Sequence, residues 1–261
     1  MLLDAWRLGV GTLTAVPVRP PVIVDRDRAG AAMMLAPLAV LPLGAAMALV
    51  AFVGQAASLP ATVTALLALA AAILGTRGFH LDGLSDTADG LAASYDSARS
   101  LSVMKSGTAG PAGVVASILV IGLQAAALSS LLATQPSWST CVLAGLALCT
   151  SRVGLAIGCM TGFRPARPDG LGATFTQTVP GWVAALLVAL AAAIVATGGW
   201  WAGLGWWRGA LAVVAAALVA VVVFVIAVRR FGGVTGDVLG ASVELGFATM
   251  LMVLSSGASL G

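Results

Sequence analysis

The sequence predicts an all-α, polytopic membrane helix bundle with about seven transmembrane helices. Of its 261 residues, 60% are hydrophobic and only 9% are charged, and the apolar residues form continuous runs long enough to span a bilayer. So few charges cannot cover the surface of a soluble protein, and the apolar content is far too high for a disordered chain. A β-barrel would show short segments of alternating polarity instead.

Seven apolar runs are expected to form spanning helices, because only a helix satisfies its own backbone hydrogen bonds in lipid. They cover residues 33–54, 61–78, 112–133, 139–161, 180–198, 209–228 and 239–259. We expect the whole chain, 1–261, to form a single integral-membrane domain. Its polar, active-site segments are expected at about 79–111, 162–179 and 229–244.

Basic residues predict the orientation of the bundle, because cytoplasmic loops are enriched in Lys and Arg. Eleven of the thirteen fall in, or at the edge of, the N-terminal segment and the three polar segments, and all ten acids lie towards the same side. The sequence therefore predicts a cytoplasmic N-terminus, a cytoplasmic active site and residence in the cell inner (plasma) membrane. Four tryptophans around the loop 199–208 are expected to form an aromatic belt at the other interface: Trp200, Trp201, Trp206 and Trp207.

The densest polar segment holds the only histidine, His80, and four of the ten acids. On a helix, Asp82, Asp86 and Asp89 fall within about 60° of one another. Carboxylates stacked on one face repel each other and are stable only if some are protonated or a cation neutralises them. Oxygen ligands without thiolates suit a hard ion such as Mg²⁺. We therefore predict that these three aspartates bind Mg²⁺ and act in catalysis, with His80 as a further catalytic candidate.

Other polar residues beside Gly-rich turns are candidates for holding an anionic substrate. Lys and Arg pair with phosphates, and glycines let a ligand approach the backbone closely. The predicted substrate- or phosphate-binding residues are Lys105, Arg152, Arg164, Arg167, Thr235, Asp237 and Glu244, and Asp237 is also assigned to the metal. The alternatives are ordinary juxtamembrane anchoring for the basic residues and an interfacial position for Glu244.

Residues 80–91, HLDGLSDTADGL, resemble the signature of the cobalamin synthase family. Three further segments agree in the same order: LTAVPV at 13–18, GLG at 170–172 and GGVTGDVLG at 232–240. The resemblance therefore covers essentially the whole chain. One departure is Ser106, where family members often carry an acid after the Met-Lys pair.

The resemblance implies a late step of cobalamin biosynthesis, the reaction of an adenosylcobinamide-GDP ribazoletransferase. A ribose hydroxyl of α-ribazole, or of its 5′-phosphate, attacks the cobinamide-linked phosphorus of adenosylcobinamide-GDP, GMP leaves, and adenosylcobalamin or its 5′-phosphate results. The family requires Mg²⁺. The expected partners are these two substrates and membrane lipid; a homo-oligomer stays open, and no nucleic acid is expected.

Two other interpretations stay open at this point. Residues 86–93 fit the opening D-x-x-D-G-x-x-A of CDP-alcohol phosphotransferases, but Ser94 stands where an Arg should follow, and residues 95–111 lack the second half of that motif. A cation-coupled transporter would use the aspartates as an ion site, and it predicts acids near the midplane in two repeated halves. The sequence shows no repeat, and its acids lie towards one face.

Overall fold

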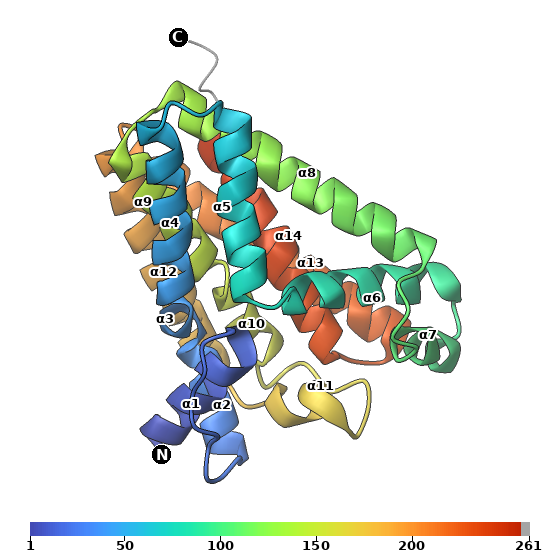
Figure 1. Cartoon of the computed structure of the whole chain (residues 1–261). Coiled ribbons are helices and arrows are strands. Elements are labelled where there is room, and N and C mark those ends of the chain that lie inside the picture. Colours follow the sequence, from blue (N-terminus) through green and yellow to red (C-terminus); the bar gives the residue numbers. More distant parts are fainter. Residues whose placement is uncertain (257–261) are drawn as a thin grey trace.

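The structure is a computed structural model of the chain, and it describes residues 1–256 (Figure 1). Every regular element in this range is a helix, which confirms the all-α prediction; two isolated β-bridges join Met160 to Val179 and Pro165 to Val234. The helices are α1 (Leu2–Leu13), α2 (Arg26–Met34), α3 (Ala36–Ala39), α4 (Leu41–Ala56), α5 (Ala61–Gly75), α6 (Phe79–Ala93), α7 (Ser97–Met104), α8 (Pro111–Thr134), α9 (Trp138–Thr150), α10 (Val153–Gly158), α11 (Gly170–Phe175), α12 (Gly181–Trp201), α13 (Trp206–Phe231) and α14 (Gly236–Ser255).

Five helical segments within residues 1–256 are long and apolar enough to cross a membrane: α8, α9 with α10, α12, α13 and α14. Helix α5 passes the same test only together with α6, and the two helices meet at 89°. Helix α4 is apolar but has only 16 residues. The polytopic bundle is thus supported, with five or six spans by this measure beside the seven runs in the sequence.

The first of those runs, 33–54, is not one helix, so this prediction was wrong. The chain forms α2, α3 and α4 there, with a proline at the second position of α3 and of α4. Proline fits the first turn of a helix but cannot continue one from the turn before, because it lacks an N–H and clashes with the preceding carbonyl. The fourth run is also interrupted, at residues 151–152, and the last positions of the seventh run lie outside the described residues.

Helix α6 turns away from α5 and lies against α8 and α14 (Figure 1). The approach of α6 to α14 depends on small residues. A Cβ added at Gly83 would lie 2.7 Å from the Asp237 carbonyl oxygen, and one added at Gly240 would lie 3.1 Å from the His80 carbonyl oxygen. This close contact brings the aspartates of α6 beside the first turn of α14.

Candidate active site

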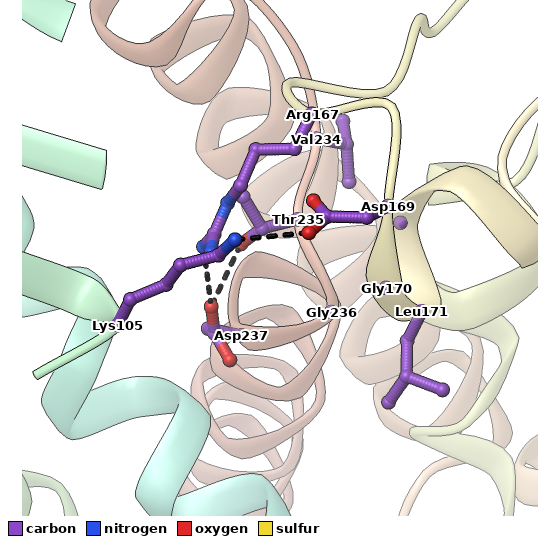
Figure 2. A pocket seen from close by; sticks show the side chains of 10 residues that line it. Lys105, Arg167, Asp169, Gly170, Leu171, Val234, Thr235, Gly236 and Asp237 are labelled. Atoms are coloured by element: carbon purple, nitrogen blue, oxygen red, sulfur yellow. Dashed lines mark hydrogen bonds and ion pairs between the residues drawn. The ribbon is translucent and has the colours of Figure 1, made fainter. Parts of the chain in front are cut away.

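A cleft of about 160 Å³ lies where three polar segments meet. Lys105, which follows α7, forms one wall, and the segment that leads into α11 forms another (Figure 2). The first turn of α14 closes it. The lining residues are Lys105, Arg167, Asp169, Gly170, Leu171, Gly172, Val234, Thr235, Gly236 and Asp237.

Backbone pairing fixes two of these segments together. The Val234 N–H donates to the Arg164 carbonyl at 2.8 Å, and the Ala166 N–H donates to the Val234 carbonyl at 3.0 Å. Glycine is required at this crossing, because a Cβ at Gly233 would lie 2.5 Å from the Arg164 carbonyl oxygen and one at Gly172 would lie 2.6 Å from the Val234 carbonyl oxygen. The Gly-rich segments thus hold Arg167 and Asp237 on one rigid support.

Both cations in the cleft are paired with carboxylates (Figure 2). Lys105 Nζ lies 3.0 Å from Asp169 Oδ2, and Arg167 Nη2 lies 3.4 Å from Asp237 Oδ2. The hydrogen bond and charge of Lys105 lower the pKa of Asp169. Thr235 caps α14 by accepting from the Val238 N–H and donates to Asp237 at 3.1 Å. An anion that enters this cleft would meet two cations and the positive end of a helix.

The aspartates of α6 lie near this cleft but do not line it. Burial, followed by the charges of Asp82, Asp237 and Asp89, raises the pKa of Asp86 to about 6, and Arg167 acts in the opposite direction. The predicted common face of α6 therefore exists and lies beside Asp237 and Arg167. Asp82 itself is exposed and lines a different hollow, between α6 and α8.

Asp89 has a structural role in this conformation. Its carboxylate accepts from the Gly110 N–H at 2.7 Å and from the Gly113 N–H at 2.9 Å, so α6 caps the start of α8. Within residues 1–256, no group of three or more His, Cys, Asp or Glu side chains is arranged to hold a metal ion. The metal assignments of Asp82, Asp86, Asp89 and Asp237 therefore stay predictions.

Four further predicted residues do not line the cleft. His80 is 1% exposed and lines a small apolar cavity with residues such as Phe175 and Leu239. Arg152 is equally buried and donates to the Leu148 carbonyl at 2.6 Å. Glu244 lines the same small cavity as Arg152 and accepts a hydrogen bond from the side chain of Gln124 at 2.9 Å. Arg164 is exposed next to the cleft and contributes its backbone to the crossing described above.

Comparison with known proteins assigns the chain to a family. The model of the cobalamin-5-phosphate synthase family matches residues 5–255. The chain belongs to the cobalamin-5-phosphate synthase family. This confirms the resemblance carried by the motifs at 80–91 and 232–240.

Relatives of this cobalamin-5-phosphate synthase family member cover it almost completely. An adenosylcobinamide-GDP ribazoletransferase from Nocardioides is 53% identical over 249 residues, which is 95% of this chain and 97% of the relative. Proteins of the same name from Frankia casuarinae and Escherichia coli are 36% and 34% identical, over 98% and 93% of this chain and 95% of each relative. No solved structure matches the chain significantly.

The sequence analysis did not identify one residue that lines the cleft and one neighbouring cation. Asp169 was not singled out, although it directly precedes the GLG segment and pairs with Lys105. Arg77 was counted only for orientation, but its side chain lines the hollow that also contains Asp82. The signal for both was their position beside a glycine turn.

Proposed function

We propose that this protein is an adenosylcobinamide-GDP ribazoletransferase. It joins adenosylcobinamide-GDP to α-ribazole, or to its 5′-phosphate, and produces GMP with adenosylcobalamin or its 5′-phosphate. The observation that carries the proposal is the cleft in which Lys105, Arg167 and the start of α14 lie beside a row of carboxylates. The row consists of Asp82, Asp86, Asp89 and Asp237. That arrangement suits a pyrophosphate substrate in a chain whose relatives bear this name.

The cations of the cleft are proposed to hold the pyrophosphate of adenosylcobinamide-GDP. Lys105 and Arg167 would exchange Asp169 and Asp237 for phosphate oxygens, and the first N–H groups of α14 would donate to the same anion. This binding orients the phosphorus atom and stabilises charge on the departing GMP. The exchange also leaves Asp237 free of its Arg167 partner.

The proton of the attacking hydroxyl needs an acceptor, and Asp86 is the proposed base. Its raised pKa of about 6 lies near the range in which a base accepts a proton efficiently at neutral pH. The ribose oxygen forms a bond to the cobinamide-linked phosphorus, the bond from that phosphorus to the GMP oxygen breaks, and the hydroxyl proton passes to Asp86. His80 lies on the opposite side of α6 from Asp82 and is less suited to this step.

The donor set fits Mg²⁺. Asp82 and Asp237 offer only oxygen ligands, and their repulsion of each other and of Asp86 would be relieved by a cation. Mg²⁺ commonly uses one or two carboxylates and takes its other ligands from water and substrate phosphates. When bound, the ion would neutralise charge on the pyrophosphate. Asp89 is less available, since its oxygens accept from two backbone N–H groups.

The proposed location is the inner (plasma) membrane, with the cleft open to the cytoplasm. The basic residues support this orientation, because the segments that hold eleven of the thirteen also build the cleft end of the bundle. Both substrates would then reach the enzyme from the cytoplasm. Neither a CDP-alcohol phosphotransferase nor a transporter is favoured by the family match.

The decisive experiment measures GMP release by the purified protein in lipid nanodiscs. Adenosylcobinamide-GDP, α-ribazole 5′-phosphate and Mg²⁺ are supplied together, and each is omitted in turn. We expect GMP only with all three. Asp237→Asn should lower turnover strongly, whereas the exposed control Asp27→Asn should not. Folded protein that releases no GMP would contradict the proposed function, and full turnover without divalent metal would contradict the Mg²⁺ assignment alone.

A further inference from the structure

A second and larger hollow, of about 500 Å³, lies between α6 and α8. It shares no lining residue with the cleft. The two sites belong to different sides of α6, because Gly83 contacts the backbone of Asp237 in α14, whereas Ser85, about 200° further round the helix, contacts Gly113 of α8. The hollow is lined by Arg77, Gly78, Phe79, Leu81, Asp82, Ser85 and Ser117.

The row of carboxylates connects this hollow to the cleft. Asp82 lines the hollow and Asp237 lines the cleft, and Gly83, next to Asp82, packs against the backbone of Asp237. A reaction that joins two substrates needs two binding sites whose reacting atoms meet at one point. Asp86 marks such a point, because it follows Asp82 by one turn of α6 and the charges of Asp82 and Asp237 both act on it.

The linings of the two sites differ in chemistry. The cleft offers two cations and a helix start, which suit a diphosphate. The hollow offers one carboxylate and two hydroxyls, which form hydrogen bonds with sugar hydroxyls, and one guanidinium, which suits a single phosphate. Phe79 and Leu81 add apolar surface against which an aromatic base can pack.

The turn between α5 and α6 orients Arg77. Arg77 and Gly78 are both left-handed, with φ of 57° and 67°, and this pair turns the chain into α6. Arg77 Nη2 donates to the Gly11 carbonyl at 2.9 Å, which anchors the side chain. A guanidinium has five N–H donors, and no other hydrogen bond from this one is found within residues 1–256, so donors remain for a ligand.

We propose that the hollow between α6 and α8 is the acceptor site, which holds the ribazole nucleoside with its ribose at Asp82, Ser85 and Ser117 and its 5′-phosphate at Arg77. The inference rests on the proposed function, with the pyrophosphate of the other substrate in the cleft. Arg77 then sets the preference for phosphorylated over free ribazole. The ribose hydroxyl reaches the phosphorus at the position of Asp86.

Steady-state kinetics with two acceptors tests this assignment. The wild type, Arg77→Gln, Arg77→Lys and Ser117→Ala are compared in nanodiscs with α-ribazole 5′-phosphate as substrate and with free α-ribazole as substrate or competitive inhibitor. Arg77→Gln should raise the KM for the phosphorylated acceptor about ten- to hundredfold, because it removes a charged hydrogen bond. It should leave free ribazole and adenosylcobinamide-GDP unaffected, and Arg77→Lys should restore part of the loss. Ser117→Ala should weaken both acceptors alike.

The matched control is Arg99→Gln, which removes an exposed positive charge of α7 that lines neither site. It should behave as the wild type. No change in Arg77→Gln, an equal loss for both acceptors, or a raised KM for adenosylcobinamide-GDP would each overturn the assignment. Should Arg77→Gln not fold, Arg77→Lys gives the test: it keeps the charge but loses the forked donors, so it should still raise the KM for the phosphorylated acceptor alone.

A lipid headgroup is the other source of phosphate, and lipid composition separates the two. The same kinetics are repeated in nanodiscs of neutral phosphatidylcholine alone. The proposal fails, and the hollow binds lipid instead, if Arg77→Gln changes the KM of both acceptors equally in anionic lipid and changes neither KM in phosphatidylcholine. A wild type that turns over neither acceptor would contradict the proposed function itself, whereas a wild type with normal turnover and an indifferent Arg77 would contradict only this inference.

Discussion

The surroundings of Asp86 are expected to affect both the stability of the protein and its activity. Its pKa is raised from an ordinary value of 3.8 to about 6, first by burial and then by neighbouring carboxylates. The folded protein therefore binds this proton more tightly than the unfolded chain, and the resulting stability is lost as the pH rises from about 4 to about 6. Asp86→Asn should be more thermostable than the wild type at pH 7.5 and no more stable at pH 4, measured in detergent with a chelator.

The same variant should lose activity. If Asp86 accepts the proton, Asp86→Asn should lower kcat about 10²- to 10⁴-fold with little change in the KM of either substrate. Asp27→Asn, which removes an exposed acid, is the control for net charge. A stabilised variant that keeps wild-type kcat would show that Asp86 is buried without being the base.

For single residues, the sequence predicted which face of a helix a side chain occupies better than which groups that side chain contacts. The spacing of Asp82, Asp86 and Asp89 gave one face of α6, and the raised pKa of Asp86 agrees with it. The same spacing could not reveal that Asp89 caps α8, because that contact depends on where residues 110–113 arrive in space. It also could not separate Glu244 from Asp237, which are seven residues apart on α14 but line different cavities.

At the scale of elements, the packing of α6 on α14 decides whether the aspartates reach the cleft. A Cβ at Gly83 would lie 2.7 Å from the Asp237 carbonyl oxygen, which is backbone and cannot move aside easily. Gly83→Ala should therefore destabilise the protein by about 1–3 kcal/mol and lower turnover. Gly122→Ala on α8, where a Cβ meets nothing within 4 Å, should be neutral or slightly stabilising. Thermal unfolding in detergent, with GMP release, measures both; equal effects of the two variants would contradict the packing argument.

Hydropathy predicts which segments are helical better than where each helix bends. Five of the seven runs coincide with helical segments long enough to span, although the fourth is interrupted and the end of the seventh is not described; the helix of the second run ends at Gly75 and passes as a span only together with α6. The 89° turn between α5 and α6 was not predicted, because it arises from two left-handed residues, of which only Gly78 is a residue type that signals such a turn. A helix bend that depends on the dihedral angles of one or two residues hardly changes the mean hydropathy of a run, so hydropathy does not reveal it.

At the scale of the whole molecule, charge and aromatic residues separate along the bundle. The cleft is lined by the segment after α7, the segment that enters α11 and the start of α14. These segments lie at the same end of the bundle as the basic N-terminal helices α1 and α2 (Figure 1). Four exposed tryptophans gather where α12 ends and α13 begins, and Trp138 at the start of α9 packs edge-on against Trp201, with ring centroids 4.2 Å apart. Such an arrangement is typical of an interfacial belt on one side and a cytoplasmic face on the other.

This polarity predicts which loops a membrane-impermeant thiol reagent reaches in intact cells. The native cysteines Cys141, Cys149 and Cys159 are buried, so the wild type should stay unlabelled. Ser58→Cys, in the turn between α4 and α5, should be labelled from outside, because the basic segments lie at the opposite end of the bundle. Ser106→Cys, beside Lys105, should be labelled only after the cells are opened. The opposite pattern would place the cleft outside the cell, where cytoplasmic substrates could not reach it.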